Sequence, residues 1–321
     1  MAVINAPGDS ASRIYRALRL IRRVEEEVAR IYPSDKIKSP VHLSIGQESV
    51  AVGVCDPLEA RDAVSGTYRG HAAYLAKGGN LRAMMAELFG KATGCAKGKG
   101  GSMHLVEMSC NVLGASAVVG TSIPLAVGYA LAQKRRQTGA VVVVFFGDGA
   151  TEEGVFTESL NFAALHQLPV IFVCENNQYA IHTPLSKRWA TDRLCERVST
   201  YGIIAHKVTD ADVFKIRQIV ADALPGLRAG TSQPLFLECQ TYRWLEHVGP
   251  NEDFSAGYRN ADDMAVWKKT DQVEVVGARL KPEERAAIDR EIEAGIADAI
   301  AFAEQSPFPN PEQLFEHVLA S

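Results

Sequence analysis

Three residues in the middle of the chain offer oxygen atoms of the kind that bind a small, hard cation. Asp148 offers a carboxylate within a Gly-Asp-Gly turn, Asn177 offers an amide at the end of an Asn-Asn pair, and the backbone near Tyr179 offers a carbonyl. Magnesium binds a few such oxygens and takes the rest from phosphate and water. The amides of Gly149 and Ala150 begin a helix, where phosphate is favoured. We therefore expect Asp148, Asn177 and Tyr179 to hold magnesium against a diphosphate bound by Asp148, Gly149, Ala150 and Asn177.

Each of these motifs directly follows an apolar run of the kind that forms a buried strand. The runs are residues 141–146 and 169–174, and a helix between them can bury Val155, Phe156, Leu160, Ala163 and Ala164. A strand–helix–strand unit of this length makes the strands parallel through a right-handed crossover. Both motifs then lie at the carboxyl edge of the sheet, where open parallel sheets bind ligands. Either motif alone is typical of an ordinary turn, but the pair indicates a site in an α/β fold.

Residues 145–181 resemble the thiamin diphosphate signature, in which GDG is followed at about this distance by NN. They are most similar to the alpha subunit of the first, decarboxylating component of 2-oxo acid (pyruvate or branched-chain) and acetoin dehydrogenase complexes. Further similar blocks are SIGQESVAVG, TYRGHAAYLAKGG, GKGKGGSMHL, AVVGTSIPLAVGYALA and CQTYRWLEHVGP. The resemblance implies the thiamin diphosphate-binding fold, a mostly parallel sheet with helices on both faces. It also implies a single diphosphate-binding domain over residues 1–321, with an N-terminal helical arm and a C-terminal helical extension.

The resemblance also assigns roles to individual residues. Tyr68 and Arg69 are expected to contact the diphosphate of thiamin diphosphate, and Arg243 to add a second guanidinium, the fork-shaped donor that suits phosphate. His71 is expected near the reacting carbon. His247 is expected to act on the substrate side, where a neutral histidine can accept or donate a proton near pH 7.

Four further positions bear on the cofactor ring and on the substrate. By resemblance, Val119 supports the aminopyrimidine ring, and Ala117 replaces a glycine whose backbone carbonyl bonds that ring. Leu245 replaces the first histidine of the family's active-site loop, which leaves the substrate open. Val248 replaces a serine that is phosphorylated in the regulated animal and plant enzymes, so phosphorylation at this position is excluded.

The resemblance implies an enzyme that decarboxylates a 2-oxo acid or cleaves acetoin and passes the acyl group to a lipoyl group. The chain has one α/β core, so the carboxylate that activates the cofactor must come from a beta subunit with the pyrimidine-binding domain. We therefore expect an alpha2beta2 heterotetramer, joined in a complex by a lipoyl acyltransferase. Two alternatives remain open: a carboligase that transfers an activated aldehyde in a biosynthetic pathway, and a non-catalytic diphosphate-binding assembly subunit.

Composition narrows the classes of protein and of partner that remain. With 321 residues, 47% hydrophobic, the chain can bury a substantial core, and a net charge of −4 gives no reason to expect nucleic acid or an anionic membrane as partner. The six cysteines show no C-x-x-C spacing, so we expect reduced thiols, buried at Cys174 and Cys239. No apolar run is long enough to span a bilayer, and the start lacks a signal-peptide core, so we expect a cytoplasmic protein.

Several segments outside the central unit also have a clear pattern. Apolar side chains recur at helical spacing over residues 12–32, and helices are expected at 81–89, 122–136 and 271–303, with a strand at 234–240. The charged residues of the first helix, Arg22, Arg23, Glu25, Glu26 and Glu27, are expected to form a solvated face with pairs along the helix.

Overall fold

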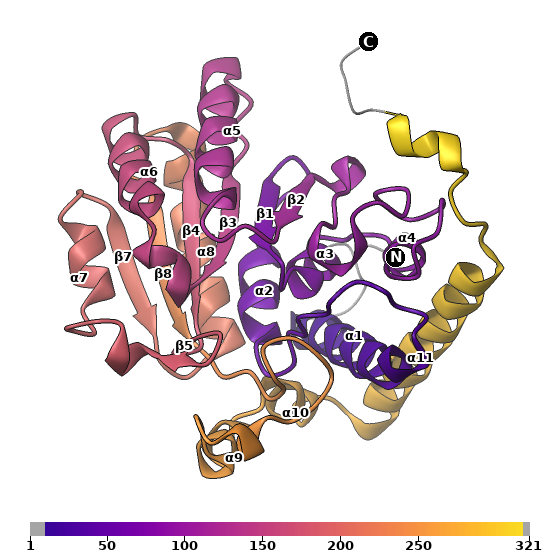
Figure 1. Cartoon of the computed structure of the whole chain (residues 1–321). Helices are drawn as coiled ribbons and strands as arrows, with labels where there is room; N and C mark the ends of the chain where they lie inside the picture. Colours follow the sequence, from indigo (N-terminus) through magenta and orange to yellow (C-terminus); the bar gives the residue numbers. More distant parts are fainter. Residues whose placement is uncertain (1–9, 317–321) are drawn as a thin grey trace.

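The computed structural model describes residues 10–316, and a six-stranded, all-parallel sheet forms its centre (Figure 1). In sheet order the strands are β2 (Val112–Ser116), β1 (Ala63–Thr67), β3 (Val142–Gly147), β4 (Val170–Asn176), β8 (Leu235–Gln240) and β7 (Ile204–Val208). The predicted β3–helix–β4 unit and the predicted last strand are confirmed. A separate antiparallel pair joins β5 (Tyr179–Ala180) to β6 (Thr183–Pro184).

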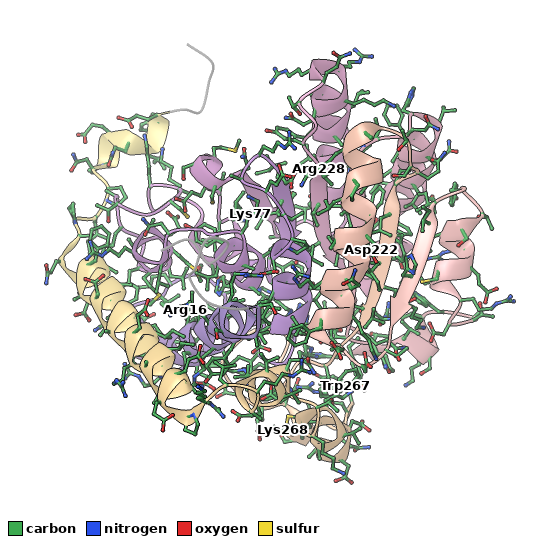
Figure 2. All side chains as sticks on the ribbon, turned by 180° about the vertical axis from the view of Figure 1, so that it is seen from behind. Arg16, Lys77, Asp222, Arg228, Trp267 and Lys268 are labelled. Carbon is green, nitrogen blue, oxygen red and sulfur yellow. The ribbon has the colours of Figure 1, made fainter. Side chains whose placement is uncertain are left out.

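Helices cover both faces of the sheet, as expected for its buried central strands β3 and β4. One face packs against α5 (Ser122–Arg136), α6 (Gly154–Leu165) and α7 (Leu194–Ser199), with Phe146, Phe156 and Phe236 at the centre of that core. The larger core on the other face includes α2 (Glu48–Cys55), α3 (His71–Ala76) and α8 (Val213–Ala229). Figure 2, seen from behind, shows α8 in front of the sheet with Asp222 and Arg228 along it.

The remaining helices lie away from the sheet and are α1 (Ser10–Ile31), α4 (Leu81–Leu88), α9 (Ala261–Lys268), α10 (Gln272–Gly277) and α11 (Pro282–Gln305). All of them except α9 contribute buried residues to this second core. The chain also has seven short 3-10 turns in the described residues: η2 (Tyr32–Ser34), η3 (Gly101–Met103), η4 (Met108–Cys110), η5 (Asp148–Glu152), η6 (Leu185–Lys187), η7 (Phe254–Ala256) and η8 (Pro311–Phe315). Helix α1 packs against α2, α3, α10 and α11, which places it inside the second core.

The expected solvated face of α1 is wrong for two of its charged residues. Arg22 is buried and pairs with Glu48 and Asp271, with the Arg22 Nη1–Asp271 Oδ2 distance at 3.0 Å. Glu25 is fully buried and binds the ring of His71 at 2.8 Å. These partners come from other elements, and a helical pattern alone does not reveal them. The pairs of Arg23 with Glu26 and of Glu27 with Arg30 along the helix do form.

The cysteines and the helices of the fold bear on two expectations from the sequence. All six cysteines are free, and Cys174 and Cys239 are buried, which confirms the expected thiols. Burial raises the pKa of both thiols well above the usual value. Between residues 10 and 316, no helix is both long and apolar enough to cross a bilayer.

Candidate cofactor and metal site

The two predicted motifs meet at the carboxyl edge of the sheet because β3 and β4 pair in register. Gly147 lies opposite Glu175 at the ends of these strands, so Asp148 and Asn177 leave the sheet side by side. They border a cavity of about 200 Å³. The residues that line it are Gln47, Thr67, Tyr68, Arg69, Val119, Gly120, Gly147, Asp148, Gly149, Ala150, Glu175, Asn177, Tyr179, Ala180, Ile181 and His247.

The carboxylate of Asp148 divides its two oxygens between different environments. Oδ2 forms an ion pair with Arg188, whereas Oδ1 is buried and has no hydrogen-bond partner. Burial raises the pKa of Asp148, and Arg188 opposes that rise. A buried carboxylate oxygen without a partner is unfavourable unless a cation or donor completes it. Asp148 therefore fits a metal ion at Oδ1.

Asn177 is held between two neighbours on the same side of the cavity. Its Nδ2 donates to Gln47 Oε1 at 3.0 Å, and its Oδ1 accepts the backbone N–H of Tyr179 at 3.1 Å. Within residues 10–316, no group of three or more His, Cys, Asp or Glu side chains is arranged to hold a metal. A metal at this edge would therefore depend on one carboxylate together with amide and main-chain oxygens, the set that magnesium accepts when phosphate supplies the rest.

The turn after β3 differs from the expected helix start. Asp148–Glu152 forms the 3-10 turn η5, and α6 begins only at Gly154, so the amides of Gly149 and Ala150 belong to a single tight turn. A Cβ at position 149 would lie 3.1 Å from the Cβ of Ala180. A side chain at position 149 would therefore crowd Ala180 where the η5 turn passes the loop after β4.

The rings of Tyr68 and His247 line the cavity near Arg69, and the ring of His42 packs against both of them. The ring centroids of Tyr68 and His247 are 5.5 Å apart, and His42 lies 4.4 Å from Tyr68 and 5.0 Å from His247. Burial, followed by the charge of Arg69, lowers the pKa of both histidines to about 3. Both imidazoles are therefore neutral near pH 7, and each can donate from one ring nitrogen and accept at the other.

Arg69 lines the cavity, but two of its donors are already engaged. Nη1 donates to the carbonyl of Leu43 at 2.6 Å, and Nη2 donates to the carbonyl of His247 at 3.3 Å. Glu175 lies nearby, and burial raises its pKa to about 7 against the opposing charge of Arg69. The guanidinium thus links the segment before α2 to the loop that carries His247.

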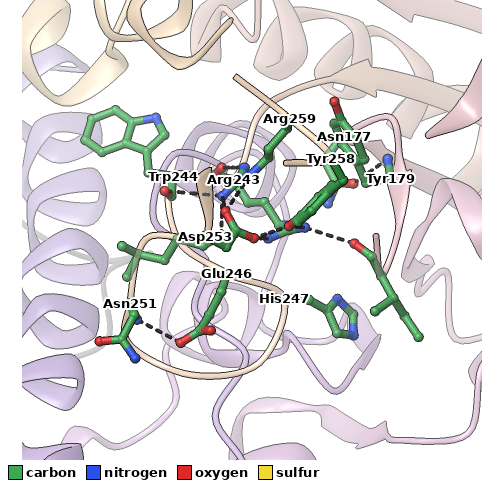
Figure 3. A network of polar contacts seen from close by, with 12 residues as sticks. Asn177, Tyr179, Arg243, Trp244, Glu246, His247, Asn251, Asp253, Tyr258 and Arg259 are labelled. Carbon is green, nitrogen blue, oxygen red and sulfur yellow. Dashed lines mark hydrogen bonds and ion pairs between the residues drawn. The ribbon is translucent and has the colours of Figure 1, made fainter. Parts of the chain in front are cut away.

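Arg243 lies outside the residues that line the cavity, in the buried network of Figure 3. Its Nη1 donates to the carbonyl of Leu245 at 2.7 Å and to Asp253 at 3.2 Å, and its Nη2 donates to Tyr258 and to the carbonyl of Ile181. Only Nε is left without a partner. In this arrangement Arg243 holds the loop of residues 243–253 against the loop after β4.

His71 also lies away from the cavity. One ring nitrogen contacts Glu25 and the other contacts the hydroxyl of Ser102, both at 2.8 Å, and the side chain is fully buried. Glu25 in turn accepts the backbone N–H of Ser44 at 2.7 Å. The histidine therefore sits in a closed polar cluster between α1, α3 and the η3 turn.

The positions expected at the cofactor ring and at the substrate differ in exposure. Val119 lines the cavity and is 44% exposed, whereas Ala117 is partly buried and is not among the lining residues. Leu245 packs against the larger core, so the side chain that replaces the family's first histidine turns away from the cavity. Val248 is 41% exposed.

Sequence reasoning missed several residues at this site. His42 stands two positions before Ser44, where the block SIGQESVAVG begins, and Gln47 lies within that block. Their closeness to this motif was an available signal. Glu175 stands directly before the Asn-Asn pair, and this position was the available signal for it. The sequence contains no signal that marks Arg188 as part of this site, because its contact with Asp148 depends on how the intervening loop folds.

The architecture thus defines an α/β protein with a polar cavity at the carboxyl edge of a parallel sheet. A family model described as "Dehydrogenase E1 component" matches residues 16–312, which is most of the chain. The chain therefore belongs to the dehydrogenase E1 component family, and the resemblance seen in its motifs is confirmed. Membership implies thiamin diphosphate as the cofactor.

Curated relatives match along nearly the whole chain. The alpha subunit of the acetoin:2,6-dichlorophenolindophenol oxidoreductase of Bacillus subtilis is 37% identical over 318 residues, covering 98% of this chain and 94% of that protein. The alpha subunit of the pyruvate dehydrogenase E1 component of Zymomonas mobilis is 36% identical and covers 98% of this chain and 90% of its own length.

Solved structures confirm the fold class. A transketolase from Leishmania mexicana superposes with a TM-score of 0.56 at 17% identity, covering 93% of this chain and 47% of that one. A transketolase from Pichia stipitis gives a TM-score of 0.56 at 19% identity, covering 92% and 45%. This chain therefore spans about half the length of those transketolase chains, and at this identity the likeness concerns the fold alone.

Proposed function

We propose that this chain is the alpha subunit of a thiamin diphosphate-dependent dehydrogenase that cleaves a 2-oxo acid or acetoin and passes the acyl group to a lipoyl acceptor. The observation that carries the proposal is the unpartnered, buried Oδ1 of Asp148 beside Asn177 at two neighbouring strand ends. The names of the family and of the relatives agree with this activity. No feature of the cavity favours the carboligase or the non-catalytic alternative over it.

The residues of the cavity can be given separate tasks toward the cofactor. Asp148, Asn177 and the carbonyl of Tyr179 would hold Mg²⁺, while Gly149 and Ala150 would offer backbone N–H groups of the η5 turn to the diphosphate. Tyr68 and Arg69 border the same space and would contact the diphosphate. When bound, thiamin diphosphate supplies the electron sink for breaking a bond next to a carbonyl, and the protein supplies position and electrostatics.

Other residues would act on the ring and on the substrate. Val119 and the backbone carbonyl of Ala117 would support the aminopyrimidine ring. The neutral ring of His247 would donate or accept a proton at one of its ring nitrogens on the substrate side. His71 and Arg243, which lie outside the cavity lining, would act from their buried clusters.

The proposal includes a second chain. The face formed by α5, α6 and the turn before α5 exposes large apolar side chains, of which Val119 also lines the cavity: Val118, Val119, Leu125, Phe162 and Leu165. In Figure 1, α5 and α6 lie side by side on this face. We propose that a beta subunit with the pyrimidine-binding domain covers this surface in an alpha2beta2 assembly that works with a lipoyl acyltransferase in the cytoplasm. Residues 1–321 would form a single diphosphate-binding domain with helical additions at each end.

The test is reconstitution with the cognate beta chain. The purified complex should reduce 2,6-dichlorophenolindophenol with pyruvate, a branched-chain 2-oxo acid or acetoin, and only when both thiamin diphosphate and Mg²⁺ are present. Replacing the dye with a lipoyl domain then tests the acceptor. Condensation of two carbonyl compounds without dye reduction would instead establish a carboligase, and failure of every substrate would contradict an active dehydrogenase.

A further inference from the structure

Arg188 contacts Asp148 from outside the cavity. Its Nη2 binds Asp148 Oδ2, its Nη1 binds Glu152, and its Nε donates to the carbonyl of Thr183 at 3.1 Å. The Arg188 side chain is 8% exposed and the Asp148 side chain 1% exposed. One buried guanidinium therefore holds the η5 turn after β3 and the β5–β6 hairpin after β4 at the same time.

The side from which Arg188 approaches decides how it can act. Arg188 borders a separate surface hollow with Glu152 and Trp189, and it is absent from the residues that line the cavity beside Asp148. It reaches only Oδ2 and leaves Oδ1 unpartnered. A cation that stood in the metal's place would engage the oxygen that the metal needs. Arg188 leaves that oxygen available instead.

The hairpin that Arg188 holds carries backbone strain. Gln178 and Ile181 have φ values of 69° and 55°, a conformation that is unfavourable for a β-branched residue such as Ile181. Such a conformation persists only where the surroundings hold it. Arg243 donates to the carbonyl of Ile181 at 2.9 Å, and Arg188 donates to that of Thr183. Two arginines thus hold the hairpin that begins at Tyr179.

We propose that Arg188 is a positioning residue for the metal site, which orients Asp148 so that Oδ1 faces the ion and fixes the hairpin that presents the carbonyl of Tyr179. This inference rests on the proposed function, because it assumes a metal at Asp148. Groups that hold metal ligands in place typically contribute 10–100-fold to metal affinity. Coulomb's law alone predicts the opposite sign, because removing a positive charge beside Asp148 would strengthen cation binding.

The sign of the change in metal affinity therefore tests the proposal. Mn²⁺ affinity is measured by electron paramagnetic resonance on the complex assembled with its beta chain, at saturating thiamin diphosphate. Arg188→Gln should weaken Mn²⁺ binding by ~10–100-fold. Arg188→Lys keeps the charge but cannot reach all three acceptors, so its affinity should lie between those of wild type and Arg188→Gln. Hydrogen exchange of residues 178–188 should rise in both variants.

Two controls separate the possible failures. Arg193→Gln removes an exposed arginine of the same segment that pairs only with Glu196 nearby, and it should leave Mn²⁺ affinity unchanged. Asp148→Ala should abolish Mn²⁺ binding. If Asp148→Ala abolishes binding but both Arg188 variants bind Mn²⁺ as tightly as wild type or more tightly, the positioning role is wrong and the metal site stands. If Asp148→Ala has no effect, the proposed function itself fails. Should Arg188→Gln not fold, Arg188→Lys decides.

Discussion

The rings of His42 and His247 meet edge to face with their centroids 5.0 Å apart, and burial lowers the pKa of each to about 3. Both histidines titrate near 6.5 in the unfolded chain. Between about pH 3 and pH 6.5 the unfolded state therefore binds more protons than the folded state. The free energy of unfolding consequently decreases as the pH falls through this range. The stability that the neutral pair confers is complete above about pH 6.5 and is lost as the pH falls toward 3.

This relationship predicts a pH-dependent difference between variants. The free energy of unfolding of the wild type, measured with urea, should fall more between pH 7 and pH 5 than that of the double variant His42→Gln/His247→Gln. His166→Gln, which changes an exposed histidine, should keep the wild-type dependence on pH. Equal losses in wild type and in the double variant would show that the two rings are not held neutral.

Asp148→Ala should abolish Mg²⁺-dependent binding of thiamin diphosphate and leave the fold intact. The reason is that the substitution removes the one carboxylate of the proposed metal site, whose Oδ1 has no other partner. Calorimetry on the assembled complex measures the affinity, and circular dichroism checks the fold. Unchanged cofactor affinity would refute the assignment.

His247→Ala should lower turnover by ~10²–10⁴-fold if the histidine transfers a proton in the rate-limiting step, while the dissociation constant of the cofactor stays near wild type. The measurement is steady-state turnover at saturating cofactor, with calorimetry on the same sample. A variant that loses cofactor affinity but keeps turnover would mean that this loop clamps the cofactor and that the proton donor lies elsewhere.

Arg243→Ala should weaken cofactor binding, and the structure indicates a reason besides direct contact. Arg243 donates to the carbonyls of Leu245 and Ile181 and to Asp253, so its loss should also loosen both loops. Hydrogen bonds to charged groups contribute ~1.5–3 kcal/mol each, which sets the scale of the loss in unfolding free energy. Urea unfolding and cofactor titration measure the two effects separately. Weaker cofactor binding with unchanged stability would favour direct contact with the diphosphate.

Leu125→Asp should prevent assembly with the beta chain while the alpha chain stays folded, because a charge on an exposed apolar side chain is tolerated in water but not in an interface. Leu314→Asp changes a similarly exposed leucine near the carboxyl end of the chain, and this variant should assemble normally. Co-purification of tagged alpha chain with beta chain measures the difference. The alpha chain alone should show no turnover, and normal assembly of Leu125→Asp would place the partner on another surface.

The sequence by itself determined the local elements and the meeting of two motifs. Apolar runs and helical spacing predicted β3, β4, β8 and the helices between residues 12 and 303, because burial of a strand or helix leaves a periodic pattern in the chain. The crossover rule then placed Asp148 and Asn177 at one edge, and the pairing of Gly147 with Glu175 confirms that placement. Recognition of the family followed from the same local motifs, since each is short and continuous.

Only the tertiary structure decided which side chains contact each other across the chain. Arg22 and Glu25 resemble an exposed helical face in the sequence, yet Glu48 and His71 bury them. Nothing local distinguishes Arg188, which binds Asp148, from the exposed Arg193 of the same segment. Ion pairs and ring contacts depend on distance and burial after folding, whereas periodicity records only which side of its own element a residue occupies. The environment of a charge was therefore settled by packing between elements far apart in the sequence.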